Sequence, residues 1–522
     1  MKLIKSTAII GSMTLLSRIL GLVRDILWAR FLGAGVINDA LLTAIKLPNL
    51  FRRMFAEGAF NSAFVPMYAR RLEGEGEDAA ANFAGEALAA LTLLVAVIVV
   101  AFQLTMPWSL NLIGGGLSRT EVPGLEGVIP YNLAVFYARI TMPYLIFMSL
   151  AALLSGMLNT RNKFAVAAFV PAMLNVLWLA VLGSQAFTST PAETLGLYMA
   201  CGMTISGLLQ VGLLIIALKR AAIRLPIKWP RFTPGVKRLL ILGLPGVIAA
   251  GITHINLMIS HLIATQQVGA PSWLYYSDRL YQLPLGLIGI AMGVALLPTL
   301  SRSLRAGDED GAMVTLNRAA EISAFLTLPA AVALFVMPNY LITTLFERGL
   351  FTSTDSLQTA RALRMFALGL PAFVLIKVLT PTFFAREDTR TPMIFAGISA
   401  VVNLALGATL FFTVGFYGLA LATSVAAWGN VLCLAIAQRF RGHFTLDARL
   451  KRKLPRIIIA AAVMGGALFY IVPVARPMMR QQVLWDYGLM LCVAGAGFAI
   501  YIAAAFAIRA FSMRDIKEAF KK

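Results

Sequence analysis

The stretch SRILGLVRDILWAR, residues 17–30, carries Arg18, Arg24 and Asp25 inside an apolar run near the start of the chain. A charged side chain deep in a membrane helix is costly unless it faces water, a partner charge or a bound ion. The planar guanidinium group of arginine matches phosphate oxygens better than an ammonium group does. If this run crosses a membrane, its residue types therefore predict an anion-binding cavity.

More charges follow in the next apolar run. Asp39, Lys46 and Arg53 are spaced at intervals of seven, so they share one stripe of a helix. Arg52 neighbours this stripe, and Glu57 lies four residues after Arg53, within reach of an ion pair along a helix. The pattern predicts a second helix that contributes charge to the same cavity.

The segment YYSDRLYQLP, residues 275–284, adds Asp278, Arg279 and Gln282, and Lys377 lies midway along a later run. Six of the deep charges are basic and four are acidic: Arg18, Arg24, Lys46, Arg52, Arg53 and Arg279 against Asp25, Asp39, Glu57 and Asp278. The acids can pair with only four of the bases, so the surplus predicts a bound anion. For any single arginine, extension to lipid headgroups or a purely structural role stays open.

The elements that must position these charges are transmembrane helices. The chain has 522 residues, of which 59% are hydrophobic and 13% charged, and its mean hydropathy is +0.80. About 20 apolar residues cross a bilayer core as helix. We therefore predict an all-α polytopic membrane protein with fourteen spans, near residues 6–32, 36–67, 79–107, 130–158, 164–186, 193–218, 239–266, 273–301, 312–338, 357–385, 391–414, 417–438, 455–474 and 484–508.

The basic residues predict the orientation of these spans. The start of the chain is basic and apolar, but no signal-cleavage site precedes Arg18, so we expect a retained first helix. With the N-terminus inside, the segments predicted outside hold few of the 45 lysines and arginines: Arg30, Arg119, Arg348, Arg476 and Arg480. Both termini are therefore predicted in the cytoplasm. The net charge of +21 is spread over many cytoplasmic segments, which favours contact with anionic membrane lipids over nucleic acid binding.

An internal repeat divides the chain. Residues of matching type recur 228 to 236 positions apart: Gly33 and Gly269, Pro48 and Pro284, Pro66 and Pro298, Arg70 and Arg302, Glu77 and Glu309, Pro143 and Pro371, and Asn175 and Asn403. We predict a six-helix lobe over residues 1–220, a second over 221–445, and two additional helices within 446–522. Both lobes start inside, so they are parallel repeats related by a pseudo-two-fold axis along the membrane normal, with a substrate path between them. Pro48, Pro143, Pro284 and Pro371 are expected to bend helices that line this path.

Several blocks resemble a known family. The segments SRILGLVRD, FLGAG, KLPNLFRRMFAEGAFNSAFVP (46–66) and YYSDRLYQLPLG (275–286) are similar to those of the MurJ (MviN) lipid II flippases of the MOP exporter superfamily. The resemblance extends from Met1 to about Arg514 and includes the two extra C-terminal spans. It implies that Arg18, Arg24, Arg52 and Arg279 line a central cationic cavity, and that Asp39, Lys46, Arg53 and Glu57 fall on family motifs. Gln282 departs from relatives that have a glutamate there, which puts the role of an acid at this position in doubt.

The resemblance implies a transporter of the bacterial inner membrane rather than an enzyme. Its substrate would be undecaprenyl-diphosphate-MurNAc(pentapeptide)-GlcNAc, or lipid II, with the diphosphate on Arg24, Arg52 and Arg279 and with Arg18 close by. The polyprenyl tail would lie in lipid or in a groove of the last two helices. We expect a monomer without a cofactor or a metal site, with Asp25 pairing the arginines and chloride as a counter-anion in the empty cavity.

Other functions remain as alternatives. A flippase for another polyprenyl-diphosphate saccharide would use the same anion chemistry. A cation-coupled drug exporter would be expected to use a cavity carboxylate, yet the seventh, eleventh and twelfth spans contain no Asp or Glu. A membrane enzyme is disfavoured because no nucleophile–base pair or metal-ligand spacing is present. His254 and His261 share one stripe of the seventh span and could bind protons or a headgroup, although a structural role is the simpler interpretation.

Overall fold

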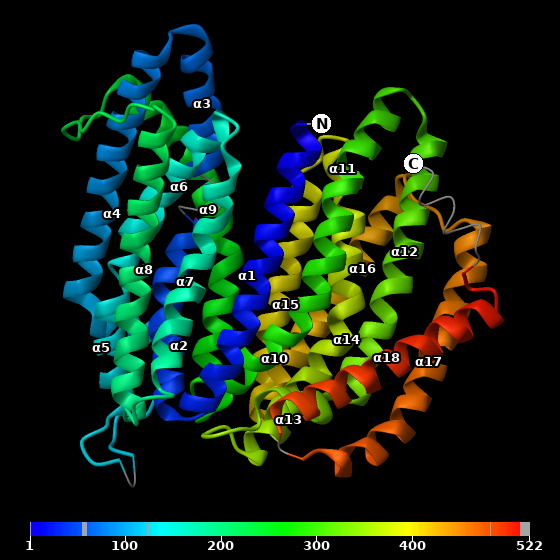
Figure 1. The fold of residues 1–522 in the computed structure, drawn as a ribbon. Helices are drawn as coiled ribbons and strands as arrows, with labels where there is room; N and C mark the ends of the chain where they lie inside the picture. Colours follow the sequence, from blue (N-terminus) through cyan, green and yellow to red (C-terminus); the bar gives the residue numbers. More distant parts are fainter. Residues whose placement is uncertain (1, 55–59, 123–124, 481, 512–522) are drawn as a thin grey trace. The chain divides into compact units, whose positions relative to one another are not determined.

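All fourteen predicted spans lie on helices. The computed structural model describes residues 2–54, 60–122, 125–480 and 482–511, and its regular structure there is helical apart from one isolated bridge between Val122 and Leu125 (Figure 1). The predicted all-α class is therefore confirmed. Within the described residues, ten helices or helix pairs are long and apolar enough to cross a membrane. The other four predicted spans lie on α1, on α2 with α3, on α9, and on α10 with α11, and three of these four carry the predicted cavity charges other than Lys377.

Contacts divide the chain into two units, which we describe separately. Unit 1 comprises Met1–Ser272 and Arg348–Phe351. Its helices are α1 (Lys2–Leu32), α2 (Val36–Met54), α3 (Phe60–Gly74), α4 (Glu77–Gly114), α5 (Pro130–Thr141), α6 (Tyr144–Thr160), α7 (Phe164–Ser184), α8 (Ala192–Arg220) and α9 (Pro234–Ala264).

Unit 2 comprises Trp273–Glu347 and Thr352–Lys522. Its elements are α10 (Ala270–Pro284, whose first three residues belong to unit 1), the π-helix η2 (Leu285–Gly289), α11 (Ile290–Arg305), α12 (Glu309–Val336), α13 (Pro338–Phe346), α14 (Ser353–Phe384), α15 (Arg390–Val414), α16 (Tyr417–Phe440), α17 (Ala448–Ala475), the 3₁₀-helix η3 (Arg476–Met478) and α18 (Val483–Ala507).

The contact units and the predicted repeat are different divisions of the chain. α9 contacts α2, α3 and α4, so it belongs to unit 1, whereas the repeat assigns it to the second lobe. The two lobes and the C-terminal addition remain a prediction from the sequence. One local feature does recur at matched positions: Gly33 and Gly269 both have positive φ, 63° and 82°. At Gly33 a Cβ would lie 2.6 Å from the Leu350 carbonyl oxygen, so glycine is required there by space as well as by conformation.

The predicted proline bends differ in kind. At Pro143 the predicted span is interrupted and forms two helices, α5 and α6, and Pro284 is followed directly by the π-helix η2. Both are usual ways in which a chain accommodates the missing N–H of proline. Pro48 and Pro371 lie inside α2 and α14, which continue past them. Pro143 and Pro284 therefore produce the clearest breaks in helical geometry.

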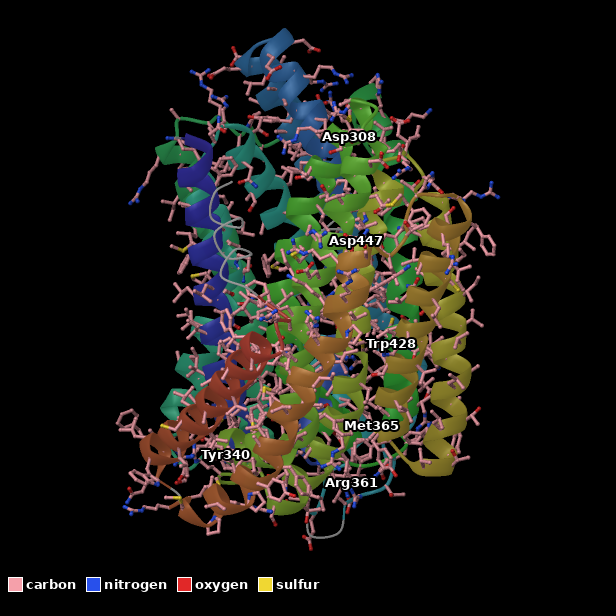
Figure 2. The ribbon with its side chains drawn as sticks, turned by 90° about the vertical axis from the view of Figure 1, so that its right-hand side faces the viewer. Asp308, Tyr340, Arg361, Met365, Trp428 and Asp447 are labelled. Atoms are coloured by element: carbon pink, nitrogen blue, oxygen red, sulfur yellow. The ribbon has the colours of Figure 1, made fainter. Side chains whose placement is uncertain are left out.

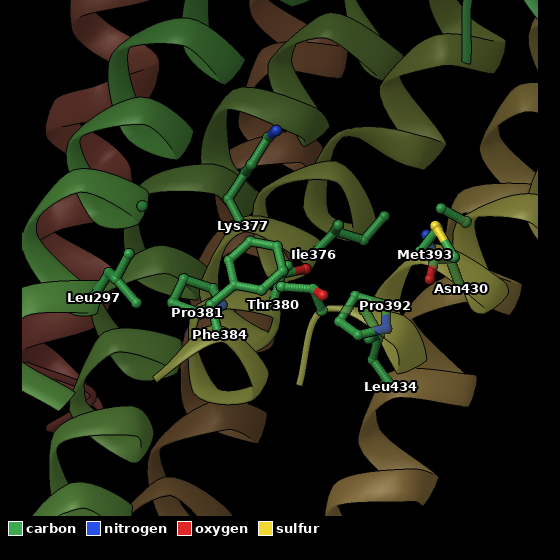
Figure 3. A pocket seen from close by; sticks show the side chains of 13 residues that line it. Leu297, Ile376, Lys377, Thr380, Pro381, Phe384, Pro392, Met393, Asn430 and Leu434 are labelled. Atoms are coloured by element: carbon green, nitrogen blue, oxygen red, sulfur yellow. The ribbon is translucent and has the colours of Figure 1, made fainter. Parts of the chain in front are cut away.

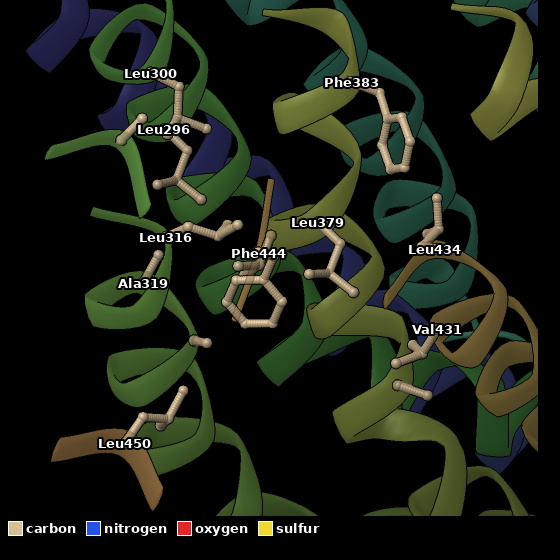
Figure 4. Close-up of a cluster of buried hydrophobic side chains, with 14 of the residues drawn as sticks. Leu296, Leu300, Leu316, Ala319, Leu379, Phe383, Val431, Leu434, Phe444 and Leu450 are labelled. Atoms are coloured by element: carbon tan, nitrogen blue, oxygen red, sulfur yellow. The ribbon is translucent and has the colours of Figure 1, made fainter. Parts of the chain in front are cut away.

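In unit 1, α1 packs along α7, and α2 contacts α5 and α9. In unit 2, α14 is central and contacts α11, α12 and α16. Figure 4 shows the apolar core that they share, with Leu296 and Leu300 from α11, Leu316 from α12, and Leu379 and Phe383 from α14. This core anchors the helix α14 that carries Lys377.

The C-terminal helices α17 and α18 pack on α12 and α13 (Figure 1). Their contact is a second apolar core that includes Phe325, Tyr340, Met464 and Tyr501. Asp308 and Asp447, from segments both predicted to be cytoplasmic, lie toward one end of unit 2, whereas Tyr340 and Arg361 lie toward the other end (Figure 2).

Candidate functional site

Arg24 on α1 is the most fully enclosed of the predicted arginines. Only 7% of the residue is exposed. Its Nε and Nη2 donate to Asp25 Oδ1 at 2.9 and 2.6 Å, and its Nη1 donates to Asn175 Oδ1 at 2.6 Å. The guanidinium carbon lies 5.1 Å from the ring centre of Trp178 and 5.9 Å from that of Trp28. The expected Asp25–Arg24 pair is therefore present, and an amide and two indole rings also contact the guanidinium group.

Sequence reasoning missed these neutral partners of Arg24. The sequence marks Asn175 only as a repeat position, and the two tryptophans carry no signal that separates them from ordinary core residues. Gly21 is the one sequence feature that fits this contact. A Cβ at Gly21 would lie 3.8 Å from Asn175 Nδ2, so α1 and α7 approach each other closely at this glycine. Ring faces attract a guanidinium ion, so Trp28 and Trp178 stabilise Arg24 without neutralising it.

Arg18 is half-buried and lies six residues before Arg24 on the same helix. α1 is assigned as one helix through Gly21, so the two positions lie about 9 Å apart along the axis and roughly 120° apart around it. Regular helical geometry therefore directs Arg18 and Arg24 to different sides of α1.

Asp39 at the start of α2 has a clear structural function. It is 2% exposed, and its carboxylate accepts hydrogen bonds from the backbone N–H of Gly269 at 2.6 Å and from the N–H and hydroxyl of Ser272 at 3.1 and 2.5 Å. These donors form the beginning of α10, where a carboxylate satisfies N–H groups that have no partner within the helix. The neighbouring Asn38 joins this network by donating to Gly33 O and to Ser272 Oγ.

The remaining predicted charges of α2 are less buried. Arg52 is half-buried and its Nε donates to Asn49 Oδ1 at 3.2 Å. Lys46 and Arg53 are exposed, and Glu57 lies outside the described residues. The stripe predicted from the seven-residue spacing therefore runs from a buried, hydrogen-bonded acid to exposed bases.

Asp278, Arg279 and Gln282 lie together on α10 in unit 2, and all three are half-buried. The Gln282 amide donates to Asp278, and the guanidinium carbon of Arg279 lies 4.7 Å from the ring centre of Tyr275. Gln282 therefore engages Asp278 as a neutral group. Among the four predicted substrate-binding arginines, Arg18, Arg24 and Arg52 belong to unit 1 and Arg279 belongs to unit 2.

Lys377 on α14 is exposed and lines a cavity of about 600 Å³ within unit 2 (Figure 3). The walls come from four helices and include Leu297 of α11, Phe384 of α14, Met393 of α15 and Asn430 of α16. Lys377 is the only charged residue among the thirteen that form these walls. The cavity is therefore an apolar chamber with one cationic group.

His261 is buried on α9, and its Nε2 lies 3.0 Å from Thr43 Oγ1 of α2. Thr43 also donates to the Asp39 carbonyl oxygen, so His261 belongs to a hydrogen-bonded contact between α9 and α2. His254 is half-buried on the same helix. Among the described residues, no group of three or more His, Cys, Asp or Glu could hold a metal ion.

A second buried charge cluster, which the sequence did not predict, lies in unit 2. Glu321 on α12 has a side chain that is 3% exposed and accepts from Arg318 at 2.6 Å, from Arg449 at 3.1 Å and from Lys453 at 2.7 Å. Arg318 also pairs with Asp447 at 2.6 Å. Because Arg449 and Lys453 lie on α17, this cluster fastens the C-terminal helices to α12.

Comparisons with known proteins agree on one family. The family model described as lipid II flippase MurJ matches residues 28–487. The chain is 43% identical to a probable lipid II flippase MurJ of Rhizobium meliloti, over all of this chain and 97% of that protein. It is 34% identical to the lipid II flippase MurJ of Burkholderia cenocepacia, over 90% of each chain.

Solved structures give the same result. A lipid II flippase MurJ in an inward closed conformation superposes with a TM-score of 0.78 at 26% identity, covering 96% of this chain and 98% of that one. An inward-facing multidrug MATE transporter of the MOP superfamily gives a TM-score of 0.69 at 14% identity, covering 81% of this chain and 94% of that one. At that identity the second match shows a shared fold alone.

Proposed function

We propose that this chain, which belongs to the MurJ family of lipid II flippases, moves lipid II from the cytoplasmic to the periplasmic leaflet of the inner membrane. Family membership makes it a multi-span membrane transporter and not an enzyme. No covalent bond of the substrate changes. The protein must lower the cost of moving a diphosphate and its attached sugars and peptide through a hydrocarbon layer.

The diphosphate binds to Arg24, Arg52 and Arg279, with Arg18 about 9 Å from Arg24 along the axis of α1. One observation carries this proposal: Arg24 is 7% exposed, and the edge of its guanidinium group formed by Nε and Nη2 binds a carboxylate, that of Asp25, while Nη1 donates to the neutral amide of Asn175. A diphosphate carries more charge than one carboxylate and matches the fork of the guanidinium group. The substrate can therefore replace Asp25 on Arg24. Asp25 and chloride serve as counter-anions when no substrate is bound.

Translocation follows the alternating-access scheme of transporters built from repeats. The headgroup enters from the cytoplasmic side, and rocking of the two six-helix lobes opens its cavity to the periplasm. The tail stays in lipid or along the apolar surfaces of α17 and α18, where Phe469, Leu491 and Phe498 are exposed. The termini lie in the cytoplasm and the protein works as a monomer. The membrane potential can drive the step, since moving one charge fully across is worth about 2.3 kcal/mol per 100 mV.

The test uses Arg24→Ala, Arg52→Ala and Arg279→Ala in cells depleted of their own flippase. Each variant should reach the membrane and fail to restore growth, whereas the control Arg305→Ala, which removes an exposed arginine at the end of α11, should complement. Normal growth with all three cavity variants would contradict the proposal.

A second test measures lipid II exposure in proteoliposomes, with and without an imposed potential. Added lipid II should compete for transport, and other polyprenyl-diphosphate saccharides should compete weakly. Equal competition by those saccharides would favour the broader flippase activity instead.

A further inference from the structure

The contact between α1 and α7 contains a buried amide that joins two turns of α1. Asn175 on α7 is 7% exposed. Its Oδ1 accepts from Arg24 Nη1 at 2.6 Å, while its Nδ2 donates to Ser17 O at 3.0 Å and lies 3.3 Å from Ser17 Oγ. Ser17 and Arg24 are about two helical turns apart. One side chain of α7 therefore fixes both the backbone of α1 and the guanidinium group that it carries.

Asp25 and Asn175 engage different nitrogen atoms of Arg24. Asp25 takes Nε and Nη2, which form the edge that binds an oxyanion in a bidentate manner. Asn175 takes Nη1. An anion can therefore replace Asp25 while Asn175 continues to hold the guanidinium plane in place.

The chemistry of the amide suits this task. An amide oxygen accepts a hydrogen bond from the guanidinium group without a full negative charge, so Arg24 stays able to attract a diphosphate. A carboxylate of the same size would neutralise it. The rings of Trp178 and Trp28 restrict the guanidinium plane further, also without charge.

We propose that Asn175 is a positioning residue for substrate binding, holding the Arg24 guanidinium so that a diphosphate can replace Asp25. This inference rests on the proposed function, because it assumes that Arg24 binds the diphosphate. It adds that the binding site depends on a neutral residue of a helix other than α1.

The chain supplies a matched control in Asn403 of α15. It is the repeat counterpart of Asn175 and is similarly buried, at 8% exposed. Its Oδ1 accepts from Thr423 of α16 at 3.3 Å, a contact between neutral groups. Replacing either asparagine with leucine removes a buried amide of the same size, but the Asn175 replacement removes a hydrogen bond to Arg24 whereas the Asn403 replacement removes one to Thr423.

The experiment measures binding of undecaprenyl diphosphate to the purified full-length protein in detergent, together with the melting temperature of each variant. Asn175→Leu should weaken binding about tenfold, and Asn403→Leu less than twofold, while the two lower the melting temperature by similar amounts. In an Arg24→Ala background, adding Asn175→Leu should weaken binding no further, because the amide acts through Arg24.

The outcomes separate this inference from the proposed function. If Arg24→Ala binds weakly and Asn175→Leu binds like the parent protein, the positioning role is overturned and the proposed function stands. If Arg24→Ala binds normally, both fail. An equal loss from Asn175→Leu with and without Arg24 would also overturn the inference, since it would show a purely structural effect.

Should Asn175→Leu not fold, Asn175→Asp retains the size and an acceptor, and it should bind more weakly because it adds a negative charge beside Arg24. Unchanged binding by that variant would overturn the inference.

Discussion

α4 in unit 1 and α12 in unit 2 begin with the same residues, Glu-Asp, 232 positions apart. In both helices the glutamate pairs with an arginine from a later turn: Glu77 with Arg161 at 2.8 Å, and Glu309 with Arg386. Beyond this start the two helices differ. At the position of Ala89 in α4, α12 has the buried Glu321, and at the position of the exposed Leu93 it has the buried Phe325.

The difference follows from what covers each helix. Much of α4 carries exposed apolar side chains, including Leu104 and Trp108, as expected of a surface facing lipid. α12 is covered by α17 and α18, and two basic residues of α17 pair with Glu321. A carboxylate would be costly on a surface facing lipid but is stabilised when three cations enclose it. The comparison teaches that α12 can hold a buried acid because basic residues of α17 pair with it.

The largest predicted effect tests the Glu321 cluster. Glu321→Ala, which introduces the residue type of Ala89 in α4, should lower the free energy of unfolding by about 3 kcal/mol, because it leaves three partly buried cations without their shared carboxylate. Unfolding in detergent measures this change. Glu309→Ala on the same helix, at an exposed position, is the control and should cost less than about 1 kcal/mol. Equal losses would contradict the difference between α4 and α12.

The next effect concerns the apolar contact between Phe325 of α12 and the C-terminal part of the chain. Phe325→Ala should lower the free energy of unfolding by about 3 kcal/mol, because the ring packs on Tyr501 and Phe511 at centroid distances of 5.2 and 4.4 Å. The matched Leu93→Ala removes an exposed side chain of α4 and should change stability by about 0.5 kcal/mol or less. The same unfolding assay compares the two. A large loss from Leu93→Ala would show that α4 is also covered.

A smaller effect depends on pH and lies in the turn before α15. Hydrogen bonds from Thr391 and Arg441 hold the pKa of Asp388 below its ordinary value. Asp388 lies two residues after Arg386, and Lys163 lies two residues after Arg161, the arginine that pairs with α4. The lowered pKa stabilises the folded state at neutral pH, and this contribution is lost as the pH falls below about 4 toward the lowered pKa. The difference in melting temperature between the parent protein and Asp388→Asn should therefore shrink as the pH is lowered from 5 to 3. A constant difference over that range would rule out this role.

The smallest effects come from the shared ion pairs. The side chains of Glu77 and Glu309 are 67% and 61% exposed, so Glu77→Gln and Glu309→Gln should each cost about 1 kcal/mol or less and should lose their effect in high salt. Unfolding at low and high ionic strength measures both. Unequal costs would show that the two turns do not have equivalent roles.

Periodicity and composition were enough to predict most of the fold, because long apolar runs bounded by basic loops have few alternatives to membrane helices. The short helix α13, the break at Pro143 and the π-helix after Pro284 depend on local backbone geometry that hydropathy does not report. For the candidate site, the charges themselves were evident, since ionised residues are rare in apolar runs. Asn175 and Glu321 were not singled out, because an amide or an acid in a long sequence carries no sign of its spatial partner.

The sequence by itself determined that the protein is a helical membrane protein, which of its residues carry unusual charge, and which family it resembles. Only the tertiary structure decided the setting of each charge: Arg24 lies between an acid, an amide and two rings, Asp39 satisfies the start of α10, and Glu321 binds α17. The physical reason is that hydropathy and charge are properties of single residues, whereas the free energy of a buried charge depends on partners brought from distant parts of the chain.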